Sequence, residues 1–124
     1  MNNAVQYTEP QPAIVLTKAL KNAAEYWSIN NKQLGEFIGL SEATVSRLKN
    51  GHYLLDPASK QWQLAVLFLR AFRGLDAYMG GHVENECLWL KSENTALGGT
   101  PLSLMRSVEG LASIVQYIDY LRGQ

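Results

Sequence analysis

The chain has 124 residues, of which 47% are apolar and 18% charged, and its 11 Lys and Arg balance its 11 Asp and Glu. This length fits one compact domain, or two very small ones that share a core. The high apolar content excludes a disordered chain. The only cysteine, Cys87, cannot form an internal disulfide, which is typical of a protein from the reducing cytoplasm.

The sequence predicts neither export nor membrane insertion. The N-terminal residues contain no basic segment followed by an apolar one. The longest apolar run, Leu64 to Leu69, is far shorter than the roughly 20 residues needed to cross a bilayer. We therefore expect a cytoplasmic protein with no membrane partner.

Charge is distributed unevenly along the chain. Residues 1–74 carry a net charge of +3, and residues 75–124 carry a net charge of −3. A basic front half suits a polyanion such as nucleic acid, and an acidic back half suits a different partner. We therefore expect a polyanion site, if there is one, in the first half of the chain.

The first predicted element is an amphipathic helix. Residues 1–12 contain two prolines and no apolar period, so we interpret them as a loose lead-in. From Ala13 onward, apolar residues recur every three or four positions, as they do on one face of a helix. These residues are Leu16, Leu20, Ala23, Ala24 and Trp27.

Two short helices with a tight turn between them come next. The first covers Lys32 to Ile38 and ends at Gly39, which can adopt the positive φ of a helix stop. The second covers Glu42 to Lys49 and is followed by an Asn-Gly pair. Ser41 can cap it, because a serine hydroxyl accepts hydrogen bonds from the free N–H groups of the first turn.

A long helix is predicted to follow. Asp56 and Pro57 indicate its start, because a carboxylate can cap free N–H groups and proline fits the first helical turn. Its apolar residues lie on two faces, so we expect it to be buried on two sides. Gly80 and Gly81 indicate its end.

The last third of the chain is also predicted to be helical. We predict a helix near Val83 to Leu90, a polar loop from Ser92 to Thr100, a short helix opened by Pro101 and a last helix from about Val108. No segment alternates apolar and polar residues for long, so we expect no sheet. The predicted fold class is all-α. Its predicted parts are a first domain (13–55), a connecting helix (56–80) and a small C-terminal domain (81–124).

The stretch LGEFIGLSEATVSRLKNG, residues 34–51, resembles the helix-turn-helix of the Xre family of Cro-like and phage repressor-like proteins. The resemblance depends on a small residue at Gly35, a turn glycine at Gly39 and a β-branched residue at Val45, which let two helices cross at close range. Alanine is more usual in place of Gly35, and glycine inside a helix costs about 1 kcal/mol relative to alanine. The same three residues would also suit a helix pair that serves packing alone.

The resemblance implies binding to double-stranded DNA with the second helix in the major groove. Arg47 can bond guanine bidentately, Glu42 can accept from cytosine, and Ala43 or Thr44 can touch a thymine methyl. By resemblance, Asn31, Gln33 and Asn50 lie where family members hold phosphates. The full set of predicted DNA-binding residues is Asn31, Lys32, Gln33, Ser41, Glu42, Ala43, Thr44, Ser46, Arg47, Lys49 and Asn50.

Each of these roles has a structural alternative. Arg47 would also fit as an ordinary solvated helix arginine. Glu42 would favour the helix N-terminus electrostatically and would repel phosphate. Asn50 would fit as a simple helix end.

The segment WLKSENTALGGTPLSLMRSVEGLASIVQYIDYLRGQ, residues 89–124, resembles the toxin-binding C-terminal domain of Xre/MbcA/ParS antitoxins. The resemblance implies a RES-domain toxin as partner, an enzyme that degrades NAD and whose active site the antitoxin blocks. The predicted partner-binding residues are Trp89, Asn94, Leu97, Gly98, Gly99, Pro101 and Arg122. The residues alone are equally compatible with a core tryptophan, a glycine turn and a proline helix start.

Nothing in the sequence indicates catalysis. The spacings of common metal, phosphate-loop and nucleophile motifs are missing. Glu84 and Glu86 are two residues apart and so lie on different sides of a helix, while Cys87 resembles a small buried residue more than a nucleophile. We therefore predict a non-enzyme with no cofactor and no metal.

Two functions remain open. The first is an antitoxin that represses its own promoter and neutralises a RES-domain toxin, and the second is a stand-alone transcriptional regulator without a toxin. Both predict a homodimer on an inverted-repeat operator, with half-sites about one helical turn apart. The predicted dimer contact is either one face of the long helix or the last helix. On the long helix the residues concerned are Leu64, Leu67 and Phe68, and on the last helix they are Ile114, Ile118 and Leu121.

Overall fold

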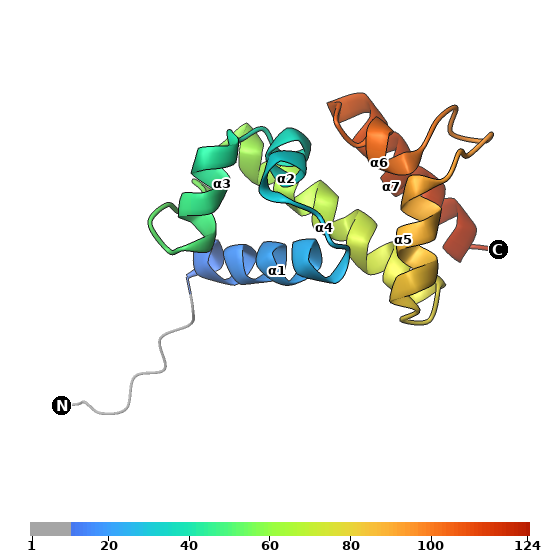
Figure 1. The fold of residues 1–124 in the computed structure, drawn as a ribbon, viewed down its shortest axis with the longest axis horizontal. Helices are drawn as coiled ribbons and strands as arrows, with labels where there is room; N and C mark the ends of the chain where they lie inside the picture. Colours follow the sequence, from blue (N-terminus) through green and yellow to red (C-terminus); the bar gives the residue numbers. More distant parts are fainter. Residues whose placement is uncertain (1–10) are drawn as a thin grey trace.

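The computed structural model describes residues 11–124, which form seven α-helices and no β-strand (Figure 1). The predicted all-α fold class is therefore confirmed. Most of the predicted lead-in lies outside the described residues, and its last residue, Pro12, already belongs to the first helix. The helices are α1 (Pro12–Tyr26), α2 (Asn31–Ile38), α3 (Glu42–Lys49), α4 (Lys60–Tyr78), α5 (Val83–Lys91), α6 (Pro101–Leu104) and α7 (Val108–Arg122).

The long helix α4 joins the two halves of the molecule (Figure 1). It packs against α1 and α2 in the first half and against α7 in the second. This confirms that the helix is covered on two sides. A single cluster of buried apolar residues runs through both halves, so the predicted domain boundaries at residues 55 and 80 stay a prediction.

The start of α4 differs from the prediction. Asp56 and Pro57 lie in a turn, where Asp56 Oδ1 accepts a hydrogen bond from the Ala58 N–H at 2.9 Å. The helix begins only at Lys60, and its capping residue is Ser59, whose Oγ accepts from the Trp62 N–H at 3.1 Å. Two capping residues three positions apart compete here, and the carboxylate closes its own local turn instead of the helix.

In the second half, α7 approaches α4 closely. A Cβ atom added to Gly74 would lie 2.7 Å from Ile118 Cγ2, so the absence of a side chain allows the two helices to touch. Near the same point, Arg70 and Asp119 form an exposed ion pair at 3.2 Å. The predicted start of α6 is confirmed, because Pro101 opens the helix, and Thr100 Oγ1 caps it by accepting from the Ser103 N–H.

This packing overturns three of the six predicted dimer contacts. Phe68, Ile114 and Ile118 are at most 1% exposed and belong to the internal core. The apolar stripes of α4 and α7 face each other within one chain, so these residues cannot reach a second copy. Leu64, Leu67 and Leu121 remain partly exposed.

Candidate nucleic-acid interface and partner-binding surface

The turn between α2 and α3 is built on two glycines. Gly39 ends α2 with a φ of 79°, and its N–H donates to the Gly35 carbonyl at 2.8 Å. The Leu40 N–H donates to the same carbonyl at 2.9 Å. A Cβ atom on Gly35 would lie only 2.3 Å from the Leu40 carbonyl oxygen. An alanine at position 35 would therefore force the turn to shift, in agreement with the prediction that a small residue here lets the two helices cross at close range.

The start of α2 carries a reciprocal cap. Asn30 Oδ1 accepts from the Gln33 N–H at 2.8 Å, and Gln33 Oε1 accepts from the Asn30 N–H at 3.0 Å. This arrangement fixes the first turn of the helix. It engages the oxygen of the Gln33 amide, whereas the amide nitrogen makes no hydrogen bond within residues 11–124.

The outer face of α3 is polar and its inner face apolar. Val45 and Leu48 are fully buried. On the outer face, Thr44 Oγ1 accepts hydrogen bonds from the Ser41 hydroxyl at 2.8 Å and from Arg47 Nη2 at 3.1 Å. The guanidinium of Arg47 is thus exposed but held against its own helix.

A polar contact joins the end of α3 to the start of α2. The Lys49 ammonium donates to Asn31 Oδ1, and both side chains are half-buried. The predicted DNA-binding residues therefore come together from the two helices and the turn that joins them. Lys32, Ser41, Glu42, Ala43, Arg47 and Asn50 are exposed, and Asn31, Gln33, Thr44, Ser46 and Lys49 are half-buried.

The predicted partner-binding residues do not form one cluster. Asn94 organises the loop before α6: its N–H donates to the Gly99 carbonyl at 3.0 Å, and its Oδ1 accepts from the Leu97 N–H at 3.2 Å. Gly98, with a φ of 81°, closes this turn and is exposed. Arg122 lies at the end of α7, and Figure 1 shows that end apart from the loop.

The two remaining predicted partner-binding residues contribute mainly to packing. Pro101 is buried, and Trp89 is half-buried against the core. The structure therefore brings Asn94, Leu97, Gly98 and Gly99 together in one loop and leaves Arg122 outside it.

A buried carboxylate that the sequence reasoning missed lies where α1, α4 and α5 meet. Glu86 is 0% exposed; its Oε1 accepts from Trp27 Nε1 at 3.0 Å, and its Oε2 has no partner among the described residues. Burial raises the pKa of Glu86 to about 7; the Trp27 hydrogen bond lowers it, and nearby Asp76 raises it further. One signal was available, since Glu86 precedes the buried Leu90 by four positions and so shares its helix face.

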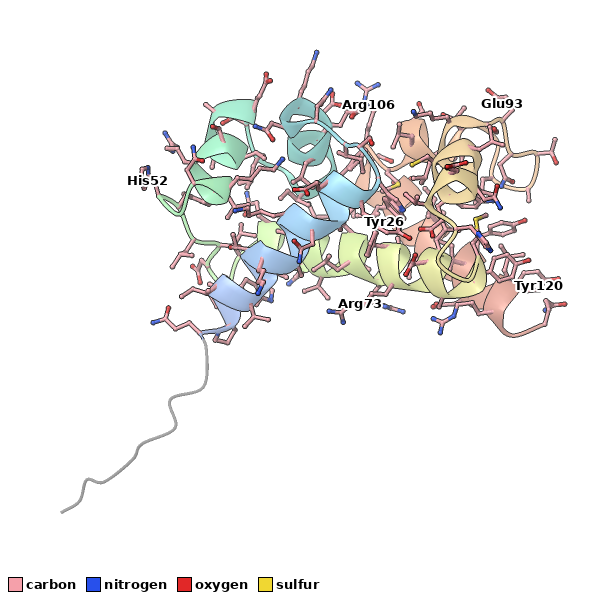
Figure 2. The ribbon with its side chains drawn as sticks, turned by 60° about the horizontal axis from the view of Figure 1, so that its bottom comes forward. Tyr26, His52, Arg73, Glu93, Arg106 and Tyr120 are labelled. Carbon is pink, nitrogen blue, oxygen red and sulfur yellow. The ribbon has the colours of Figure 1, made fainter. Side chains whose placement is uncertain are left out.

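Tyr26 completes this cluster from α1. Its hydroxyl lies 2.9 Å from Asp76 Oδ1, to which it donates, and 3.0 Å from the Gly81 carbonyl (Figure 2). Burial and the Asp76 contact raise the pKa of Tyr26 to about 12, so the phenol stays a donor at neutral pH. The half-buried Cys87 Sγ lies 3.7 Å from the Trp27 carbonyl, in keeping with a packing role.

Within residues 11–124, no group of three or more His, Cys, Asp and Glu side chains is placed to hold a metal ion. None of the helices in this part of the chain has both the length and the apolar character of a membrane span.

Comparison with protein families gives two matches. Residues 8–70 match the family model of the antitoxin Xre-like helix-turn-helix domain. Residues 75–123 match that of the antitoxin Xre/MbcA/ParS C-terminal toxin-binding domain. Comparison with curated proteins finds no match. Because the first match spans just over half of the chain and contains the α2–α3 pair, this chain belongs to the family of antitoxins with an Xre-like helix-turn-helix domain.

Proposed function

We propose that this antitoxin is a sequence-specific DNA-binding regulator that represses its own promoter and neutralises a RES-domain toxin. The observation that carries the DNA-binding part is the outer face of α3, where Arg47 is exposed and oriented by Thr44. A helix with a polar outer face and two buried apolar anchors can enter the major groove without disturbing the core. No cofactor or metal takes part.

In this proposal Arg47 reads a guanine, because a guanidinium matches its O6 and N7 atoms. Glu42, Ala43, Thr44 and Ser46 complete the face of α3 toward the bases. Phosphates are held by the start of α2 and the end of α3, where Lys49 and Asn31 meet. The remaining predicted contacts, Lys32, Gln33, Ser41 and Asn50, flank these two positions.

Replacing Arg47 with alanine should weaken operator binding by roughly 1 to 3 kcal/mol and relax specificity at one base pair. Lys49→Ala serves as the comparison, because losing a phosphate contact should weaken all sequences alike and reduce the salt dependence. Fluorescence anisotropy on the native operator and on single-base variants measures both effects.

The same titrations should show two chains on each inverted repeat, as a homodimer requires. Its proposed contact is either the partly exposed Leu64 and Leu67 on α4 or the partly exposed Leu121 on α7. Unchanged affinity and specificity in Arg47→Ala would refute base readout by this residue, and one chain per operator would refute the dimer.

The toxin-binding part of the proposal is supported by the match of residues 75–123 and by the exposed loop around Gly98. A polar loop held rigid by Asn94 can enter the cleft of an enzyme at low entropic cost. The proposed target is a RES-domain toxin, and the loop around Gly98 is the element that enters its cleft.

A charged side chain at the tip of this loop should abolish toxin binding. We expect Ala96→Arg to lose capture of a co-expressed RES-domain toxin and its inhibition of NAD degradation by at least about tenfold, because the new cation needs space in a packed interface. Ala58→Arg, an equally exposed alanine in the turn before α4, should change neither. If wild-type protein captures no RES-domain toxin from cells that express one, the stand-alone regulator is the better description.

A further inference from the structure

A groove of about 320 Å³ lies between α2 and the C-terminal helices. Gln33 and Glu36 line it from α2, and Lys91 and Arg106 line it from the opposite side. Gln33 belongs to the proposed phosphate-binding residues, whereas neither cation across the groove belongs to the helix-turn-helix. The groove thus continues the proposed DNA-binding surface onto the toxin-binding half of the chain.

We propose that Lys91 and Arg106 bind DNA backbone phosphates that flank the half-site read by α3. This inference rests on the proposed DNA-binding function and extends it to the C-terminal half. The ligand is the phosphodiester backbone, which carries anionic oxygens but no sequence information. The C-terminal domain then contributes affinity for DNA, and the bases are read by α3 alone.

The geometry of Arg106 suits such a contact. Its Nη2 lies 3.3 Å from Glu36 Oε2, and its side chain is still 60% exposed. Figure 2 shows Arg106 beside α2, on the side of the molecule away from Arg73. A guanidinium has five N–H donors, and a single contact to Glu36 leaves the others for a phosphate.

Charge along the groove favours an anionic ligand. Lys91, at the end of α5, lines the groove, is exposed and forms no ion pair within residues 11–124. Lys32 precedes the lining residue Gln33 in α2 and is also exposed, without an ion pair in the same part of the chain. Glu36 is the only acidic residue that lines the groove. The free nitrogen of the Gln33 amide adds a neutral donor at the same edge. Cations and neutral donors in one row are what a phosphate backbone requires.

The test compares variants of the full-length chain on an operator with flanking base pairs and on one trimmed to the half-sites. Arg106→Ala should bind the long operator about tenfold more weakly at low salt, with a salt slope smaller by about one phosphate contact. Its discrimination between operator variants should not change. Arg73→Ala removes the same charge from an exposed residue on the other side and should bind as the wild type does.

Trimming the operator should weaken wild-type binding most and Arg106→Ala less, because this variant has only the Lys91 contact to the lost phosphates left. The double variant Lys91→Ala/Arg106→Ala should be almost unaffected. Lys91→Ala should behave in the same way. If Arg106→Ala binds both DNA lengths as the wild type does while Arg47→Ala weakens binding, the extension is wrong and the helix-turn-helix assignment stands. If neither variant differs from wild type, base readout by Arg47 fails together with the extension, and if the wild type binds no operator DNA, the proposed DNA-binding function itself fails.

Glu36→Gln separates a phosphate contact from a structural ion pair. It removes the same ion pair as Arg106→Ala does, but it leaves the guanidinium in place and takes away a negative charge. We expect Glu36→Gln to bind DNA as tightly as the wild type or severalfold more tightly. If it weakens binding as much as Arg106→Ala does, Arg106 acts by docking the two halves together, and the proposal is overturned. Loss of toxin capture in Arg106→Ala with unchanged DNA binding would assign the groove to the toxin instead.

Discussion

Gly35→Ala should destabilise the protein by about 2 to 4 kcal/mol, although alanine is the better helix former by about 1 kcal/mol. The reason is the 2.3 Å approach of the new Cβ atom to the Leu40 carbonyl oxygen. The obstructing atom belongs to the backbone, so no side-chain rotation relieves the overlap. The α2–α3 turn must open, and the hydrogen bonds that Gly39 and Leu40 donate to Gly35 must lengthen.

Urea denaturation followed by circular dichroism measures this effect. Gly99→Ala is the matched control, since its new Cβ would meet only the Leu104 side chain, at an ordinary 3.5 Å. We expect that control to change the free energy of unfolding by less than about 1 kcal/mol. DNA affinity of Gly35→Ala should also fall at temperatures where the variant is folded, because the angle between α2 and α3 changes. A neutral or stabilising Gly35→Ala would show that the two helices do not cross this closely.

Helix boundaries were predictable wherever a single local signal decides them. Gly39 ends α2, and Ser41 and Thr100 cap α3 and α6, all as their residue types indicate. At the start of α4, Asp56 and Ser59 offer competing caps, and propensity does not rank them. The pattern indicated a small residue at position 35, but it did not show the obstructing atom, which is a backbone carbonyl oxygen five residues later in the chain.

The partners of apolar faces were not predictable. A stripe of apolar residues indicates that a helix face is covered, but it does not say by what. Phe68 and Ile118 carry the same pattern that a dimer contact would carry, and each is buried within one chain instead. The DNA-binding residues were easier to place in space, because α2 and α3 are adjacent in sequence and joined by a short turn.

Glu86 was the largest omission, because a charged residue is normally expected on the surface. Its burial follows from the meeting of α4 and α5 with α1, which lies far from both of them in sequence. Periodicity places Glu86 on the same face as Leu90, and only the fold shows that no water reaches that point.

This buried carboxylate makes stability depend on pH in an unusual direction. The pKa of Glu86 is raised from 4.5 to about 7, so the folded protein binds a proton that the unfolded chain has already released between these two values. The stabilisation is complete below about pH 4.5 and is lost as the pH rises through about 7. The difference corresponds to roughly 3 kcal/mol. Most carboxylates in salt bridges show the opposite trend.

Glu86→Gln should remove this dependence. The amide oxygen can accept from Trp27 Nε1, and the amide nitrogen can take the place of the unpartnered Oε2 and donate to Asp76. The variant should match the wild type near pH 5 and exceed its free energy of unfolding by roughly 2 to 3 kcal/mol near pH 8.

Urea denaturation at intervals from about pH 5 to pH 8 tests this directly, with Trp fluorescence as the probe because Trp27 donates to the carboxylate. Glu84→Gln removes an exposed carboxylate from the same helix and should give a curve parallel to that of the wild type. If Glu86→Gln and the wild type run parallel across this range, Glu86 is ionised throughout, and water or a cation must reach its Oε2 in solution.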